Sequence, residues 1–288
     1  MSHAFFHPLV FPSTTESVER LRADQACTGP WSADAMHGGP PSALLVRACE
    51  RVAGAGLVGL RASIDFLAPV PVDEVTVRSR VIRGGRRVTL SEAAMGAGGR
   101  QVLHARTWLL RSNTTDDGAV GDTVAGDTMA DGATTGLATI GPPTGAPTGA
   151  PPKGPQASAP TLTDWTFPYA QALEWRQVSG DPGGPGDAAV WARQRISLID
   201  GEEPTGLQRA VLVADSGNGI SAALDWDRFT FVNVDLVVHL SRPLDGEWVL
   251  LDARTRYEPG GTGLSTSVLS DEVGTVGTGA QTLLISPR

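Results

Sequence analysis

The stretch MHGGPPSALLVRACERV contains a helix start whose residue types are suited to holding an oxygen atom. Gly38 and Gly39 have no side chain, so a carbonyl or phosphate oxygen can come close to the backbone there. The free N–H groups of a first helical turn favour negative charge. Pro40 and Pro41 suit that turn, where a missing N–H costs little. The pattern also fits a plain helix start with rigid prolines, and the residues leave both interpretations open.

His37 stands directly before these glycines. A histidine at such a place can take part in catalysis, but it is more often a partly buried packing or hydrogen-bonding group. His104 and His239 lie in expected strands, and we interpret them in the same way. The histidines do not gather at metal-ligand spacing, so the sequence predicts neither a metal nor another cofactor.

Asp215 follows the apolar run AVLVA at the end of a second expected helix. A partly buried carboxylate there is a candidate general base. The segment DSGNG is also a good turn, in which the carboxylate only bonds local backbone. From the residues alone, the turn interpretation is favoured.

Arg86 and Arg87 follow an expected hairpin at Gly84-Gly85. Arginine pairs well with phosphate oxygens, which makes the two residues a candidate phosphate site. Lys153 is the only lysine, so arginine richness is general in this chain. Arg78 and Arg80 on the preceding strand fit a solvent-facing strand, and this is the favoured interpretation of the arginines around the hairpin.

Composition excludes several classes of protein. The chain has 288 residues and a net charge of −8, whereas nucleic-acid binders need a basic face. The two cysteines do not form a disulfide framework and lack metal-ligand spacing. No apolar run is long enough to span a bilayer, and the first residues do not resemble an export signal. We expect a cytoplasmic protein that does not bind membranes.

The chain divides into two parts of similar size. Residues 112–160 are rich in Gly, Ala, Thr, Pro and Asp and are expected to form a linker or insertion. Residues 1–111 and 161–288 each begin with irregular chain, continue through one apolar helix, and end in several alternating segments typical of strands. The order of elements is the same in both parts.

The two parts also match in detail, which indicates a duplicated unit. ARTWLL at 105–110 corresponds to AQTLLI at 280–285, and Gly84-Gly85 corresponds to Gly260-Gly261 at nearly the same offset. A unit of one long helix and an antiparallel sheet buries the helix by wrapping the sheet around it. We predict an α+β fold in which two such sheets join edge to edge.

MHGGPPSALL, RASIDFLAPVPV, LVADSGNGI, FVNVDLVVHLSRP and the terminal AQTLLI together resemble acyl-CoA thioesterases of the TesB-like, double-hotdog type. The resemblance covers both parts of the chain and omits the linker. It implies two fused hotdog units, with an N-terminal hotdog at 1–111 and a catalytic C-terminal hotdog at 161–288. It further implies hydrolysis of acyl-CoA without a metal, in fatty acid metabolism, and association into a homodimer or larger homo-oligomer.

The resemblance also implies roles for individual residues. Asp215 corresponds to the water-activating carboxylate, and Gln281 to a glutamine on the last strand that helps to position the water. Asn233 stands where better-known members have Thr or Ser, and an amide can hold a water as a hydroxyl does. The substrate side is implied to include His37, Gly38 and Gly39 near the thioester, and Arg86 and Arg87 at the coenzyme A phosphates.

Two other functions use the same architecture. Hotdog enoyl-CoA hydratases need an Asp and a His in a local pattern that is missing here. A non-catalytic acyl-CoA-binding protein would not need Asp215 and Gln281, although Asn233 departs from the catalytic pattern. Acyl-CoA thioester hydrolysis by an Asp-activated water is the function that the sequence favours.

Overall fold

One curved sheet wraps around the helices. The computed structural model describes residues 4–10, 18–111, 154, 165–222 and 224–288. In the first part it contains β1 (Ala4–Val10), β2 (Val18–Ala23), a 3-10 turn (Gln25–Cys27), α1 (Gly39–Ala53), β3 (Leu57–Phe66), β4 (Glu74–Arg83), β5 (Val88–Ala97) and β6 (Arg100–Arg111). Gly154 aside, the expected linker lies outside the described residues.

The second part contains the same kinds of element in a similar order. Its strands are β7 (Leu173–Ser179), β8 (Ala188–Gln194), β9 (Ser197–Ile199), β10 (Phe229–Asn233), β11 (Asp235–Leu240), β12 (Val249–Glu258), β13 (Thr262–Ser270) and β14 (Thr275–Pro287). Its helices are α2 (Pro168–Gln171), α3 (Gly206–Ala214) and α4 (Gly217–Ile220).

The two parts join edge to edge, as predicted. The described strands form one sheet in the order β7-β8-β12-β13-β14-β11-β3-β6-β5-β4-β2-β1-β9, with β10 paired to β14. The junction is the antiparallel pair β3 and β11, in which Ser63 lies opposite Val237. Ala105 of β6 and Ala280 of β14 take matching places, since each pairs inward with a junction strand and outward with β5 or β13.

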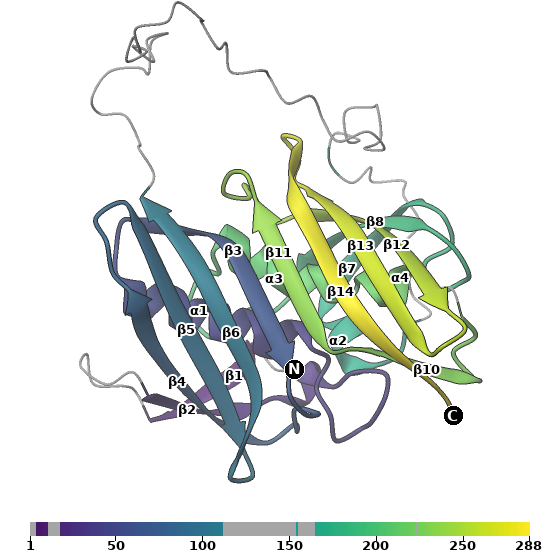
Figure 1. Cartoon of the computed structure of the whole chain (residues 1–288), viewed down its shortest axis with the longest axis horizontal. Helices are drawn as coiled ribbons and strands as arrows, with labels where there is room; N and C mark the ends of the chain where they lie inside the picture. The colour runs from purple at the N-terminus through teal and green to yellow at the C-terminus, as the bar shows by residue number, and fades with distance from the viewer. Residues whose placement is uncertain (1–3, 11–17, 112–153, 155–164, 223) are drawn as a thin grey trace, which may run out of the picture.

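α1 and α3 lie on the same side of this sheet (Figure 1). Leu44 and Leu45 of α1 are completely buried, and so is Val211 of α3. Burying one such side chain contributes about 2 kcal/mol. α1 ends at Gly54, whose φ of 88° is a conformation that L residues rarely adopt. The expected fold class, with a helix wrapped by an antiparallel sheet in each part, is confirmed.

The start of each part differs from the prediction, because strands precede the long helix in both. β1 and β2 precede α1, and β7, β8 and β9 precede α3. Residues 4–10 and 18–23 are strands rather than irregular chain, and β1 pairs in parallel with β9 of the second part. Phe5 and Phe6 are both fully buried, so this strand lacks the alternation that marks a half-buried strand. Its partner is distant in sequence, which is why local pattern did not reveal it.

Two observations apply to the described ranges alone. There, no helix is long and apolar enough to cross a membrane. The same ranges hold no group of three or more His, Cys, Asp or Glu placed to bind a metal ion.

Candidate active site

The first turn of α1 lies against the last turn of α3. A Cβ on Gly39 would collide with the carbonyl oxygen of Leu212 in α3. A Cβ on Gly38 would lie 2.8 Å from Oδ2 of Asp215 and 2.7 Å from a ring carbon of Phe66. The bare backbone therefore allows this close approach, and it brings the start of one helix to the carboxylate at the end of the other.

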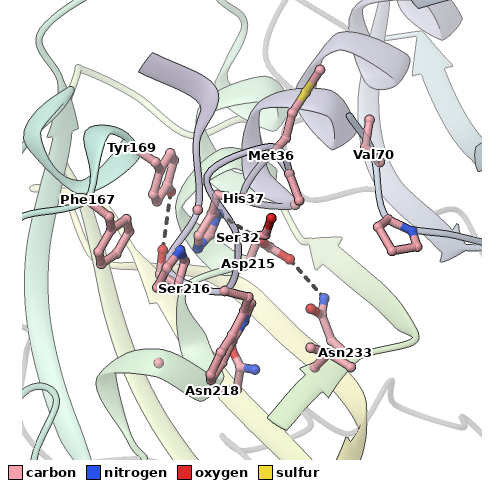
Figure 2. Close-up of a pocket in the computed structure, with 18 of the residues that line it drawn as sticks. Ser32, Met36, His37, Val70, Phe167, Tyr169, Asp215, Ser216, Asn218 and Asn233 are labelled. Atoms are coloured by element: carbon pink, nitrogen blue, oxygen red, sulfur yellow. Dashed lines mark hydrogen bonds and ion pairs between the residues drawn. The ribbon is translucent and has the colours of Figure 1, made fainter. Parts of the chain in front are cut away.

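Asp215 is the C-cap residue of α3 and its side chain is only 3 % exposed. Oδ2 lies 2.9 Å from Nδ1 of His37, and Oδ1 accepts a hydrogen bond of 2.9 Å from Nδ2 of Asn233. Figure 2 shows His37 and Asn233 reaching the carboxylate from two sides. These two partners come from different parts of the chain, so the site exists only in the joined fold.

His37 is held in place by Tyr169. Their rings stack with centroids 3.8 Å apart and planes within 9°. Tyr169 is fully buried, and burial raises the pKa of its hydroxyl, which therefore stays protonated. The hydroxyl donates to the carbonyl of Leu212 at 2.8 Å and lies 3.2 Å from Oγ of Ser216 (Figure 2). The Tyr169 side chain thus connects His37 to the end of α3.

Sequence reasoning missed Tyr169 and Ser216. Tyr169 belongs to the stretch WTFPYAQALEW, where four aromatic residues follow the linker within a few positions. This concentration is a signal in a chain with 6 % aromatic residues, although it does not reveal that one ring lies on His37. Ser216 adjoins Asp215, but nothing in its sequence context distinguishes it from an ordinary turn residue.

Gln281 lies behind the carboxylate rather than beside a space for water. Its Nε2 donates to the backbone carbonyl of Asp215 at 3.0 Å, and its Oε1 accepts from the N–H of Asn218 at 3.1 Å. The side chain is buried and does not line the cavity described below. The structure therefore places Gln281 where it fixes the backbone between α3 and α4, and not at the expected water position.

Arg86 and Arg87 are not brought to this site. They lie in the turn between β4 and β5, where the backbone carbonyl of each accepts a hydrogen bond from Arg111 at the end of β6. Arg111 pairs with Leu57 at the opposite end of β3 from Phe66. Since Phe66 borders the carboxylate, the two arginines are separated from it by the length of the strand, and the phosphate contact expected of them stays a prediction.

A cavity of about 620 Å³ opens at the carboxylate (Figure 2). His37, Gly38, Asp215 and Asn233 contribute to its wall, which both parts of the chain form. Most of the remaining wall is apolar. A buried carboxylate with a hydrogen-bonding amide on one oxygen and an imidazole beside the other, at the wall of an apolar cavity, is suited to proton transfer on a bound, largely apolar molecule.

Comparison with known proteins identifies the family. The family model described as the acyl-CoA thioesterase N-terminal domain matches residues 27–110, and the model of the C-terminal domain matches residues 143–285. The second match begins inside the segment expected to be a linker. No curated protein sequence gives a significant match.

Solved structures show the same fold over nearly the whole chain. A hot dog fold protein of unknown function from Alicyclobacillus acidocaldarius has 14 % identity and a TM-score of 0.67, covering 95 % of each chain. Acyl-CoA thioesterase II TesB2 of Mycobacterium marinum has 14 % identity and a TM-score of 0.60, covering 94 % of this chain and 92 % of its own. The tesB protein of Mycobacterium avium subspecies paratuberculosis has 15 % identity and a TM-score of 0.62, covering 93 % of each chain. With both domain models matched in order on a double hotdog fold, the chain belongs to the TesB-like acyl-CoA thioesterase family.

Proposed function

We propose that this enzyme hydrolyses acyl-CoA thioesters with a water molecule activated by Asp215. The observation that carries the proposal is the buried Asp215 carboxylate, held by His37 and Asn233 at the wall of a cavity of about 620 Å³. Among the described residues that line this cavity, Asp215 is the one acid. It is therefore the candidate base for removing a proton from water.

The two partners of Asp215 leave room for the water. Each carboxylate oxygen has two lone pairs, and Asn233 uses one on Oδ1, while Nδ1 of His37 lies 2.9 Å from Oδ2. Nδ1 of His37 accepts a hydrogen bond of 3.1 Å from the N–H of Gly39, which fixes the imidazole ring beside the carboxylate. Oδ1 of Asn233 is directed to accept the second hydrogen of the water. Together these groups orient the water for attack.

The oxyanion that forms on the thioester carbonyl needs a hydrogen-bond donor. The first turn of α1 offers few, because Pro40 and Pro41 have no N–H group. The N–H of Gly38 has no hydrogen-bond partner in the described part of the chain, and Gly38 lines the cavity. We assign this N–H to the oxyanion, where the positive end of α1 adds favourable electrostatics.

The reaction then balances with one proton carrier. Water forms a C–O bond to the carbonyl carbon as Asp215 accepts its proton, and the C–S bond breaks as the carbonyl re-forms. The protonated Asp215 returns the proton to the leaving coenzyme A thiolate. Gln281 and Asn218 do not touch the reacting atoms in this scheme, and Gln281 positions the backbone of Asp215 instead of holding the water.

Thiol release from acyl-CoAs of several chain lengths tests the proposal. Wild type is expected to release coenzyme A, and Asp215→Ala to lose this activity by about 10³-fold while its unfolding transition stays cooperative. Tight binding without hydrolysis by wild type would instead identify an acyl-CoA-binding protein. Hydration of crotonyl-CoA in place of hydrolysis would identify a hydratase.

A single turnover in H₂¹⁸O distinguishes a general base from a nucleophile. If Asp215 activates water, the released acid carries ¹⁸O in the first turnover. If the carboxylate attacks the thioester and forms an anhydride, water attack on the aspartyl side leaves ¹⁸O in the protein and none in the acid. Label in the protein after one turnover contradicts the water mechanism.

A further inference from the structure

Aromatic side chains are concentrated around the cavity at Asp215. The whole chain has 7 Trp, 2 Tyr and 7 Phe. Four of these tryptophans line the cavity, together with Phe66, Phe167 and Tyr169. In a chain with 6 % aromatic residues, this concentration exceeds what a general apolar lining requires, and it points to the shape and chemistry of the molecule that binds there.

One aromatic surface combines the two parts of the chain. Trp31 and Trp226 stack with ring centroids 4.9 Å apart and planes within 18°. Phe231 supports both of them edge-on, at 5.0 Å from Trp31 and 4.6 Å from Trp226. Each indole therefore has ring contacts that fix its plane, and both line the cavity.

A second aromatic surface comes from the segment that leads into β7. Trp165, Phe167 and Tyr169 are nearly parallel, with interplanar angles of 30° and 15° between successive rings. Trp175 meets Trp165 edge-on at 5.1 Å and Tyr169 edge-on at 6.5 Å. All of these rings line the same cavity. The cavity therefore has two aromatic surfaces, and contacts among the rings of each surface hold that surface in place.

Flat, fixed rings discriminate between kinds of acyl group. An aryl ring gains face and edge contacts with aromatic walls, worth about 0.5–1.5 kcal/mol per pair beyond simple burial. It also has few rotatable bonds to immobilise, whereas a linear alkyl chain of the same carbon number loses rotational freedom on binding. Such a cavity therefore favours a stiff aromatic group over a flexible chain.

The charges at the cavity exclude a different class of substrate. Of the described residues that line it, only His37 and Asp215 have basic or acidic side chains, and they lie against each other. No lysine or arginine is present among these residues to neutralise a second carboxylate on the acyl group. Burying such a charge without a partner is unfavourable.

We propose that the preferred substrates are coenzyme A thioesters of uncharged aromatic carboxylic acids. This proposal rests on hydrolysis at Asp215 and adds the class of acyl group that the site selects. Trp31 and Trp226 form one selecting surface, and Trp165, Phe167 and Tyr169 form the other.

Three acyl-CoAs with the same number of acyl carbons test this selection: 3-phenylpropanoyl-CoA, 3-cyclohexylpropanoyl-CoA and nonanoyl-CoA. We expect kcat/KM for the phenyl compound to exceed that for nonanoyl-CoA by about tenfold, with the cyclohexyl compound in between. Equal values for phenyl and cyclohexyl compounds would overturn aromatic selection, and so would a preference for nonanoyl-CoA.

Trp226→Leu and Trp248→Leu form a matched pair of variants. Trp226 belongs to the cavity wall, whereas Trp248 packs against Trp191 and Leu250 in a small separate cluster. Trp226→Leu is expected to reduce the phenyl-to-nonanoyl ratio by at least about threefold, and Trp248→Leu to leave it unchanged. An unchanged ratio in a folded Trp226→Leu protein contradicts the role of this wall.

Binding separates this proposal from the proposed mechanism. Dissociation constants of the matching thioether analogues, which cannot be hydrolysed, report selection without chemistry. Tighter binding of the phenyl analogue supports the substrate class even if Asp215→Ala still hydrolyses thioesters, a result that would overturn only the role of Asp215. Equal binding of all three analogues overturns the substrate class even if Asp215→Ala is inactive.

Discussion

The two ends of the α1–α3 helix pair have the same framework but different chemistry. At the first end, the start of α1 meets Asp215 at the end of α3; at the second, Thr205 at the start of α3 meets Glu50 near the end of α1. Each helix begins with a glycine that touches backbone of another segment, Gly39 at Leu212 and Gly206 at Leu244. Duplication has thus kept the packing at both ends.

The carboxylates at the two ends have different surroundings. Glu50 accepts hydrogen bonds from Oγ1 of Thr205 at 3.0 Å and from Nε2 of Gln208 at 2.6 Å. Asp215 lines the large cavity, whereas Glu50, Thr205 and Gln208 line neither of the two main cavities of the described chain. The second carboxylate therefore joins two helices, while the first also faces a space for substrate.

Two strand residues at equivalent breaks in pairing contribute to this difference. Asn233 is the last β10 residue paired with β14, and Gly59 is the last residue of β3 paired with β6 before a register shift. Asn233 donates to Asp215, but Gly59 has no side chain, and a Cβ there would lie 2.8 Å from Oε1 of Glu50. The comparison shows that a duplicated scaffold can keep a carboxylate at both ends and direct only one toward a ligand.

Among the hydrogen-bonding neighbours of the two carboxylates, His37 is expected to have the largest effect. His37→Ala removes the partner of Oδ2 and should lower kcat by about 100-fold or more with little change in KM, because the water loses its oriented base. Gln208→Ala removes the corresponding partner of Glu50 and should leave kcat within about twofold. Steady-state thiol release measures both. Equal losses in the two variants would mean that the ends do not differ in chemistry.

The helix-start glycines should respond alike in stability. Gly39→Ala and Gly206→Ala each introduce a Cβ against backbone, and each should lower the free energy of unfolding by about 1–3 kcal/mol. Urea denaturation followed by circular dichroism measures the change. A fully stable Gly39→Ala protein beside an unstable Gly206→Ala protein would show that the packing has not been kept at both ends.

Helix capping is expected to make a smaller difference between the two ends, measured as free energy of unfolding. Thr205 caps α3 through a hydrogen bond from the N–H of Gln208, whereas Gly38 at the start of α1 has no side-chain cap. Thr205→Ala should cost about 1 kcal/mol of unfolding free energy, and kcat should stay unchanged. Thr205→Ser is the conservative control that restores the cap, so failure of Ser to restore stability contradicts a capping role.

The pH dependence of stability should reveal Glu50. Burial raises the pKa of this carboxyl above its ordinary value of 4.5, although Gln208 and Thr205 act in the opposite direction. A raised pKa means that its favourable contribution is complete below about pH 4.5 and is lost as pH rises through the folded-state pKa. The Glu50→Gln variant has no carboxyl to ionise at this position, so it does not lose this stability as the pH rises.

The unfolding free energy of Glu50→Gln minus that of wild type should therefore increase from pH 4 toward pH 7. Urea midpoints at several pH values give the difference. A constant or falling difference would contradict the raised pKa.

Much of this framework is predictable from the sequence because it depends on local pattern. Apolar residues recur with a clear period in the helix after Gly38-Gly39, in the strand around Ala105 and in the corresponding strand around Ala280. The repeat then predicts the edge-to-edge junction. The α+β class and the association of both parts follow from these patterns, and the structure confirms them.

The arrangement within the site depends on contacts between distant segments. From the residues alone, Asp215 is favoured as a turn residue, because no local pattern reveals His37 or Asn233 beside it. Tyr169 reaches His37 from beyond the linker. The orientation of Gln281 is set by backbone groups of Asp215 and Asn218, and a residue type alone does not predict orientation. Local pattern also gave no means of placing the β4–β5 turn relative to the cavity.

The most direct test of the central claim is kcat of Asp215→Asn and Glu50→Gln measured side by side. Both substitutions neutralise a carboxylate at a helix end with little change in size. The account predicts that Asp215→Asn lowers kcat by about 10³-fold and that Glu50→Gln stays within about twofold of wild type. Retained activity in a folded Asp215→Asn protein, or an equal loss in both, would contradict the assignment of the chemistry to Asp215.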